Sequence, residues 1–236
     1  MKKQLFLSGF VVLIGILSSC GSSNGKETKL QEPTASEMKE NESDDDMGSK
    51  TSDSKAKTIE NLQAAFKGET TASAKYAAYA KKAEEEGHHN ISLLFKAASM
   101  AENVHANNHK SVLDDYGVQT PVITPEFTVK STKENLEDAV KGESYESTTM
   151  YPEFIKEASS SKSQLALISL NYAFETEKKH KVMYENALAA LDNNTVKSLP
   201  AVYYVCPTCG NTYDTTPPKR CGISMTSSEK FSKITG

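Results

Sequence analysis

Residues 91–116 read ISLLFKAASMAENVHANNHKSVLDDY, and this stretch decides the fold. Its apolar side chains recur in alternating steps of four and three residues, which is typical of a helix that buries one face in a bundle. Glu102 and His105 occupy the middle of that face, where Leu or Ala is usual. A lone buried carboxylate is costly to keep ionised, so the pattern predicts a positive partner for Glu102. A metal ion is the natural candidate, because Glu-x-x-His places both side chains one turn apart on one face.

Three further stretches carry the same helical period. The one before residue 91 is expected to end near Gly87, a suitable residue for a helix C-cap. The next begins at the capping-box pattern Ser131–Glu134, and Pro152 is expected to bend or interrupt it. A connection with two prolines precedes that helix and is long enough to cross the end of a bundle. The sequence therefore predicts an all-α four-helix bundle over residues 58–192.

Every one of these helices carries an acidic residue in the middle of its buried face. The set contains two Glu-x-x-His pairs, one Glu-x-x-Glu pair and one single glutamate: Glu69, Glu102, His105, Glu143, Glu146, Glu177 and His180. A single acid on such a face is more often a satisfied core polar group, but seven such residues are hard to obtain by accident. Five carboxylates facing one core would repel one another unless about four positive charges lay among them. Two iron ions, or manganese, supply that charge, and an oxygen-rich site without thiolates suits these metals better than copper.

These segments carry a family resemblance. The residues in question are Gly68-Glu69-Thr70, Ala101-Glu102-Asn103-Val104-His105, Lys141-Gly142-Glu143-Ser144-Tyr145-Glu146 with Met150-Tyr151-Pro152, and Glu177-Lys178-Lys179-His180. Over residues 58–191 and into the C-terminal segment, they resemble the rubrerythrins, non-haem di-iron proteins of the ferritin-like superfamily. The resemblance implies a ferritin-like fold in which the seven residues hold two irons. It also implies that one iron exchanges His105 for Glu146 as its redox state changes.

Three other side chains on these helices are candidates for a role at the site. Tyr76 and Tyr151 match tyrosines that lie near the metals in the family, and with Glu146 they are the candidate catalytic residues. The alternative for both tyrosines is core packing, with each hydroxyl finding some polar partner. His109 follows His105 by four residues, so a His-x-x-x-His metal pair is geometrically allowed. Such a histidine more often lies beside a site or at the edge of a bundle, and the resemblance does not place it.

Residues 201–236 form a second, small metal module. Cys206-Pro207-Thr208-Cys209-Gly210 resembles the first knuckle of a rubredoxin, whereas the second knuckle reads Cys221-Gly222-Ile223-Ser224, with a serine in place of the fourth thiolate. We expect iron or zinc held by Cys206, Cys209 and Cys221, with the Ser224 oxygen, water or another group completing the tetrahedron. A Cys206–Cys209 disulfide is the alternative in an oxidising compartment. A segment this short needs one such staple to fold.

The first 57 residues are expected to export and tether the folded part. Two lysines precede an apolar run too short to span a membrane, and Leu17-Ser18-Ser19-Cys20 follows. Residues 1–19 therefore predict a lipoprotein signal peptide with acylation at Cys20; the alternative is ordinary secretion, with Cys20 discarded or free. Residues 20–57 are polar and predict a disordered tether. The chain is thus expected to be an exported bacterial lipoprotein, held by a lipid anchor at a membrane on the periplasmic side or at the cell surface.

The resemblance implies reductive scavenging of hydrogen peroxide, with electrons relayed from the cysteine-bound metal to the bundle. In the family this relay crosses between subunits of a head-to-tail dimer, so we expect a homodimer; the sequence does not name the electron donor. The alternatives are a ferroxidase or iron-storage protein, and a non-enzymatic lipoprotein with structural metals. A nucleic-acid partner is not expected, because the net charge is −4 and Arg220 is the only arginine.

Overall fold

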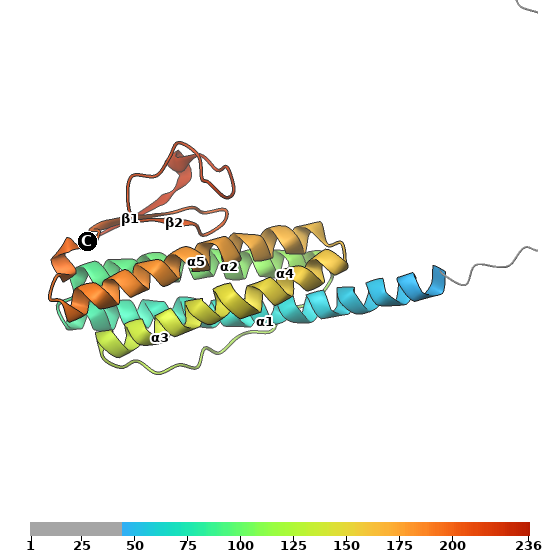
Figure 1. Cartoon of the computed structure of the whole chain (residues 1–236), viewed down its shortest axis with the longest axis horizontal. Helices are drawn as coiled ribbons and strands as arrows, with labels where there is room; N and C mark the ends of the chain where they lie inside the picture. Colours follow the sequence, from blue (N-terminus) through green and yellow to red (C-terminus); the bar gives the residue numbers. More distant parts are fainter. Residues whose placement is uncertain (1–43) are drawn as a thin grey trace, which may run out of the picture. The chain divides into compact units, whose positions relative to one another are not determined.

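The computed structural model describes residues 44–236, and its side chains from residue 52 onward. The predicted signal peptide, Cys20 and the first part of the predicted tether lie outside the described residues. Five α-helices build the bundle in Figure 1: α1 (Asp44–Glu85), α2 (His89–Asp115), α3 (Thr132–Tyr145), α4 (Tyr151–Ser160) and α5 (Gln164–Asp192). A π-helical turn, η1 (Glu146–Met150), joins α3 to α4. Together α3, η1 and α4 form one rod, so the predicted four-helix bundle is confirmed.

The π-helical turn lies where the sequence predicted an interruption. Tyr151 donates its backbone N–H to the carbonyl of Glu146, five residues earlier. Pro152 has no N–H, so the carbonyl of Thr148 loses the donor that a continuous α-helix would provide. Single π-helical turns of this kind often occur at functional sites. Here the turn begins at Glu146, one of the predicted metal ligands.

Helix α1 is longer than the sequence predicted. It begins at Asp44, so the described residues before 58, which were expected to belong to the tether, are helical. Extending an existing helix is much easier than nucleating one, and this segment contains no proline to stop it. The packed part of the helix begins at Thr58, which is fully buried and bonds to Ser161 Oγ at 3.0 Å. At its other end, Gly87 adopts a φ of +80°, as expected of a C-cap residue.

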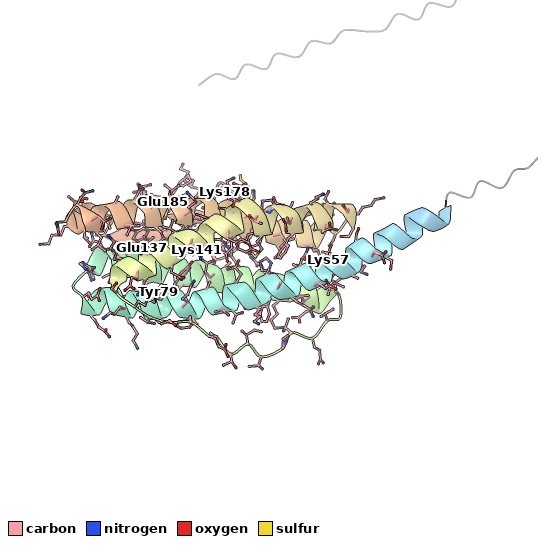
Figure 2. The ribbon with its side chains drawn as sticks, turned by 60° about the horizontal axis from the view of Figure 1, so that its bottom comes forward. Lys57, Tyr79, Glu137, Lys141, Lys178 and Glu185 are labelled. Atoms are coloured by element: carbon pink, nitrogen blue, oxygen red, sulfur yellow. The ribbon has the colours of Figure 1, made fainter. Side chains whose placement is uncertain are left out.

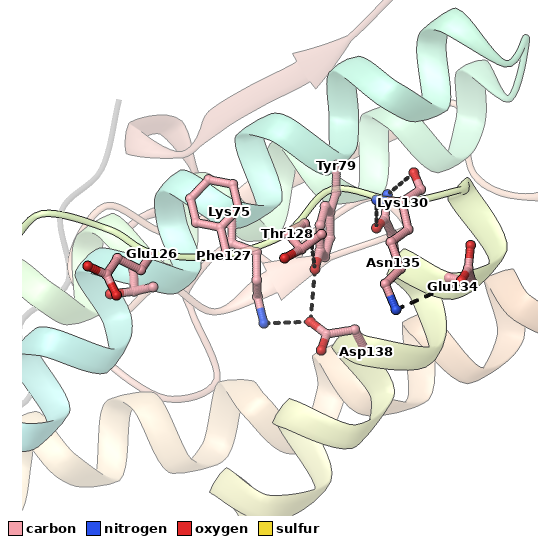
Figure 3. A pocket seen from close by; sticks show the side chains of 10 residues that line it. Lys75, Tyr79, Glu126, Phe127, Thr128, Lys130, Glu134, Asn135 and Asp138 are labelled. Atoms are coloured by element: carbon pink, nitrogen blue, oxygen red, sulfur yellow. Dashed lines mark hydrogen bonds and ion pairs between the residues drawn. The ribbon is translucent and has the colours of Figure 1, made fainter.

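The connection between α2 and α3 runs along the bundle rather than only across its end (Figure 1). The start of α3 lies beside the end of α1, where the backbone N–H of Thr132 donates to Glu86 Oε2 at 2.8 Å. Helices α2 and α3 are therefore parallel, and the chain must return the length of the bundle between them. Figure 3 shows where this connection passes over α1: the Tyr79 hydroxyl lies 3.3 Å from the Thr128 carbonyl oxygen and 3.0 Å from Asp138 Oδ2.

Two apolar clusters fill the bundle on either side of a polar layer. One contains Tyr76, Phe95 and Tyr184, and the other contains Leu113 and Leu170. The predicted metal ligands fall between these clusters along each helix. The outer faces are charged, as Lys141, Lys178 and Glu185 show in Figure 2. Among the described residues, no helix combines the length and the apolar run that a membrane span requires.

The C-terminal module is a three-stranded antiparallel sheet with the order β2-β1-β3. Its strands are β1 (Val202–Val205), β2 (Thr212–Tyr213) and β3 (Ser232–Thr235), and two 3₁₀ turns accompany them, η2 (Val196–Ser198) and η3 (Ser228–Lys230). Tyr203 and Val205 of β1 are buried in the first apolar cluster of the bundle. The Leu199 carbonyl also accepts a hydrogen bond from Asn90 Nδ2 at 2.7 Å. The module is therefore packed against the bundle of its own chain.

Candidate metal centre

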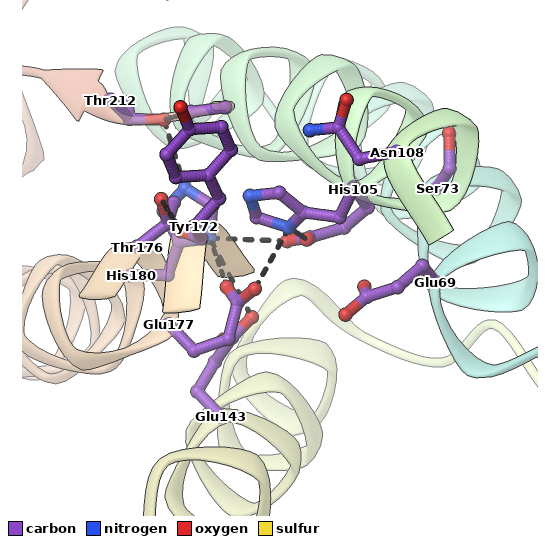
Figure 4. A network of polar contacts seen from close by, with 12 residues as sticks. Glu69, Ser73, His105, Asn108, Glu143, Tyr172, Thr176, Glu177, His180 and Thr212 are labelled. Carbon is purple, nitrogen blue, oxygen red and sulfur yellow. Dashed lines mark hydrogen bonds and ion pairs between the residues drawn. The ribbon is translucent and has the colours of Figure 1, made fainter. Parts of the chain in front are cut away.

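Six of the seven predicted ligands in the bundle are brought together in the polar layer. They form two groups whose potential ligand atoms lie within 4.8 Å of one another: Glu69, Glu102, His105 and Glu177 in the first, and Glu102, Glu143, Glu177 and His180 in the second. All six are 0–1% exposed to solvent. Figure 4 shows Glu143, Glu177 and the two histidines converging from α2, α3 and α5. Because the two groups share Glu102 and Glu177, the layer offers two adjacent cation positions with two carboxylates in common.

The carboxylates of Glu102 and Glu177 each contact both histidines. His105 Nδ1 lies 2.8 Å from Glu102 Oε2 and 2.9 Å from Glu177 Oε1. His180 Nδ1 lies 3.1 Å from the other oxygen of each carboxylate. The two Nδ1 atoms and four carboxylate oxygens thus face a common space. This is the arrangement expected where two carboxylates bridge a pair of metals.

The other nitrogen of each imidazole is held by the C-terminal module. His105 Nε2 lies 3.1 Å from the carbonyl oxygen of Cys209, which can only accept, so Nε2 carries the hydrogen. His180 Nε2 lies 2.9 Å from Thr212 Oγ1, whose own proton is donated to the Gly210 carbonyl. A neutral imidazole then has its lone pair on Nδ1, directed at carboxylate oxygens that also only accept. Such a contact is stable only with a proton or a metal cation between the two atoms.

The carboxylates of the layer fit a metal as well. Two buried oxygens, Glu69 Oε2 and Glu143 Oε2, have no polar partner, and the buried Glu102 Oε1 and Glu177 Oε1 face only the histidine Nδ1 atoms. Burial, and after it the neighbouring acids, raise the pKa of Glu69 and of Glu143 well above the usual range. Burial also lowers the pKa of His105, but Glu177 and Glu102 outweigh it and raise that pKa well above its usual value. The metal-free layer therefore holds extra protons, and cations could replace them.

Tyr76 and Tyr151 each donate to one of these acids. The Tyr76 hydroxyl lies 2.7 Å from Glu143 Oε1, and the Tyr151 hydroxyl donates to Glu69 Oε1. Both tyrosines are buried, so their hydroxyls orient the two outermost carboxylates of the layer. Glu146 differs from the other predicted ligands, because it belongs to neither group and is partly exposed. Burial, and then the charges of Glu177 and Glu102, raise its pKa well above the usual range.

The predicted cysteine ligands also meet. Cys206, Cys209 and Cys221 are buried and free, and their sulfurs lie within 4.8 Å of one another. No disulfide joins these three residues; Cys209 Sγ and Cys221 Sγ are 3.4 Å apart. Ser224 Oγ lies 3.3 Å from Cys206 Sγ, which places a hydroxyl beside the three thiols. A hydrogen bond from Cys209 lowers the pKa of Cys206 to about 4, so this sulfur is a thiolate ready to bind a metal.

Gly210 allows the cysteine module to approach the bundle closely. Its φ is +74°, and a Cβ atom there would lie 2.3 Å from His105 Nε2 and 3.1 Å from the Ala101 carbonyl oxygen. Any larger residue would push the module away. The glycine that follows the first Cys-x-x-Cys knuckle therefore also allows the contact between Cys209 and His105.

Comparisons with known proteins agree with this geometry. A model of the rubrerythrin family matches residues 60–188. Rubrerythrin-2 from Clostridium acetobutylicum is 32% identical over 177 residues, covering 75% of this chain and 96% of that protein. The chain belongs to the rubrerythrin family. Nigerythrin from Nitratidesulfovibrio vulgaris is also similar, at 31% identity over 176 residues, covering 74% of this chain and 85% of that protein.

Solved structures support the same fold. The fully reduced, all-ferrous state of nigerythrin matches with a TM-score of 0.68 and 31% identity, covering 75% of this chain and 86% of nigerythrin. Bacterioferritin from Rhodobacter capsulatus matches at 21% identity with a TM-score of 0.53, covering 58% of this chain and 87% of that one, and shares the fold alone. The predicted ferritin-like bundle with a rubredoxin-like module is thus confirmed, and membership of the rubrerythrin family supports a di-iron oxidoreductase role.

Within this rubrerythrin-type bundle, His109 is not among the clustered ligands. Its Nε2 lies 3.1 Å from the Tyr151 hydroxyl and its Nδ1 lies 2.8 Å from Ser169 Oγ. Because Tyr151 donates to Glu69, its oxygen accepts from His109 Nε2–H, and Nδ1 accepts from Ser169. Burial lowers the pKa of His109 to about 3, which keeps it neutral. The sequence allowed a metal pair with His105, but here His109 fixes the hydroxyl that orients Glu69.

Tyr184 is a further residue of the site that the sequence analysis did not single out. It is fully buried, follows His180 by one helical turn, and its hydroxyl has no hydrogen-bond partner. Its ring packs on Tyr76, with 5.4 Å between the centroids. The helical spacing from His180 was the available signal, but an aromatic residue at such a position is usually core packing.

We predict that the stability of the metal-free protein falls as the pH rises from 6 to 9. The pKa of His180 is raised to about 9 in the folded chain, chiefly by Glu102 against the effect of burial. Its contribution is therefore fully present below about pH 6.5 and is lost as the pH approaches 9, which amounts to about 3 kcal/mol. The raised pKa values of Glu69 and Glu143 act in the same direction.

Urea unfolding of chelator-treated and iron-loaded protein at several pH values measures this effect. In the iron-loaded protein, cations replace the protons, so its stability should change little over the same window. Parallel pH dependences for the two forms would show that protons and metal do not compete for the layer.

Proposed function

We propose that this chain reduces hydrogen peroxide to water at a di-iron site in the bundle, and that the cysteine-bound iron supplies the electrons. The balanced reaction is H₂O₂ + 2 H⁺ + 2 e⁻ → 2 H₂O. The observation that carries this proposal is the hydrogen bond between the Cys209 carbonyl and His105. It links a residue of the thiolate cluster directly to an imidazole of the carboxylate layer, so electrons have a short route between two predicted metal sites.

The residues of the layer divide into those that hold the irons and those that handle protons. Two ferrous ions, bound by the six clustered ligands with Glu146, would supply the two electrons. Glu146 is partly exposed, and burial and the charges of Glu177 and Glu102 raise its pKa, which favours the protonated carboxyl that could give a proton to a departing oxygen. Tyr76 and Tyr151 hold Glu143 and Glu69 in place by donating to them. The burial of the layer excludes bulk water and strengthens these interactions.

We also propose that Ser224 completes the metal site in the module. Its hydroxyl oxygen stands beside Cys206 Sγ and also contacts Thr226 Oγ1 at 2.9 Å, which orients it toward the sulfurs. An oxygen ligand is harder than a thiolate and favours ferric over ferrous iron. The module would therefore have a lower reduction potential than a site with four thiolates, and would be a stronger electron donor to the bundle.

The number of subunits, the electron donor and the location of the chain are also matters of proposal. The contact between Cys209 and His105 lies within one chain, so the relay proposed here needs no second subunit. A head-to-tail homodimer and an external electron donor stay predictions from the family resemblance. The lipid anchor at Cys20 and the location at a membrane rest on the sequence of the first residues alone.

The peroxidase proposal predicts that Glu146→Ala slows peroxide consumption by the reduced protein about 100-fold or more, the effect of losing a general acid. Glu146→Gln is the matched control for shape, and should be nearly as slow because its amide does not carry an acidic proton. Stopped-flow mixing with peroxide under anaerobic conditions, with iron content checked, measures the effect. Unchanged turnover in both variants would exclude this role for Glu146. Accumulation of many irons per chain with oxygen as oxidant would favour the ferroxidase alternative.

The ligand proposal predicts that Ser224→Cys raises the reduction potential of the iron-loaded module and makes its visible spectrum that of four thiolates. Ser224→Ala should shift both properties as well, because it removes the oxygen ligand. Redox titration of the three proteins, followed by visible absorption, provides the test. If Ser224→Ala has the potential and spectrum of the unaltered chain, the serine is not a ligand.

A further inference from the structure

A hollow open to solvent lies between α1 and the rod formed by α3 and η1. Its volume is about 360 Å³. Five of its lining residues are small, Ala64, Gly68, Thr71, Ala72 and Gly142. Lys67, Lys75, Tyr76 and Glu146 complete the walls, and of these only Glu146 is a predicted metal ligand. The hollow in Figure 3, lined by Tyr79 and Asp138, reaches none of the predicted metal ligands. The hollow at Gly68 therefore offers a route from solvent to Glu146.

The two glycines in this wall are not explained by the fold. Both lie inside helices, where glycine is less favourable than alanine. Neither has a positive φ. A Cβ atom at Gly68 would meet nothing within 4 Å, and one at Gly142 would meet only the Tyr76 hydroxyl at 3.8 Å, an ordinary contact. Neither backbone conformation nor close packing thus requires glycine here, in contrast to Gly210.

What the glycines do provide is space beside the metal ligands. Gly68 immediately precedes Glu69, and Gly142 immediately precedes Glu143. Glu143 Oε2 is buried without a hydrogen-bond partner, while its Oε1 accepts from Tyr76 at 2.7 Å. Side chains at both positions would fill the hollow in front of Glu146. Helix stability is therefore given up at the two positions that border the polar layer.

We propose that this hollow is the entrance through which peroxide and other molecules of similar size reach the di-iron site, and that Gly68 and Gly142 keep it open. The identity of the substrate rests on the function proposed above, whereas the route itself does not. Glu146 lines the hollow and is partly exposed, whereas the six clustered ligands are buried and do not line it, so an incoming molecule meets this carboxyl before it meets them.

The test compares Gly68→Leu, which fills the entrance, with Gly68→Ala, which adds only a Cβ atom. Two rates are measured in iron-loaded protein: azide binding to the oxidised form, followed by visible absorption, and reoxidation of the reduced form by hydrogen peroxide. Gly68→Leu should slow both rates by about tenfold or more, because its side chain fills the entrance. Gly68→Ala should slow both rates by only about twofold, because a single Cβ atom narrows the entrance without filling it. Thr71→Leu fills the same hollow from a residue that does not adjoin a ligand, and should act like Gly68→Leu.

A second readout needs no metal. If glycine is kept only for access, Gly68→Ala should raise the melting temperature of the metal-free protein by about 2–4 °C, through better helix propensity. A lower melting temperature would mean that the fold requires the glycine, and would overturn the proposal. Azide and peroxide rates in Gly68→Leu and Thr71→Leu equal to those of the unaltered chain would also overturn it. Slow azide binding in both leucine variants, with no peroxide consumption by any protein, would uphold the entrance and reject the peroxidase function.

Discussion

The structure depends on the contact between two imidazoles and two carboxylates at the centre of the bundle. His105 and His180 each donate through Nε2 to the C-terminal module, which leaves their Nδ1 atoms facing Glu102 and Glu177. These atoms can approach so closely only if positive charge lies between them. Apolar clusters on either side bury the six clustered ligands and keep bulk water from hydrating them. The need for positive charge, from protons or from metal cations, is therefore built into the packing of the helices and is not confined to a surface site.

The two histidines also join the bundle to the cysteine module. Because His105 and His180 are oriented by Cys209 and Thr212, the cysteine module takes part in constructing the bundle site. Gly210 makes this approach feasible by leaving no side chain between the module and His105. A change in charge at the cysteine cluster is then felt at the imidazole through a single hydrogen bond. Ligand orientation and the proposed electron supply thus share one structural element.

Much of this could be predicted from the sequence, because helical periodicity and ligand spacing are local properties. The interruption at Pro152 followed from its missing N–H, and the end of α1 followed from Gly87. The start of α1 was misplaced, since polar composition does not reveal that an established helix continues outward. The lengthwise connection before α3, the sharing of Glu102 and Glu177, and the partners of His109 all depend on contacts between distant segments. Such contacts leave no local pattern in one sequence.

The central claim is that paired cations neutralise the acids of the polar layer, and X-ray diffraction at the iron absorption edge tests it most directly. Crystals of protein produced with iron should show two anomalous peaks inside the bundle, one contacting Glu69 and His105 and the other contacting Glu143 and His180. A packed bundle without anomalous peaks, in which the acids are protonated and bonded to one another, would contradict the account.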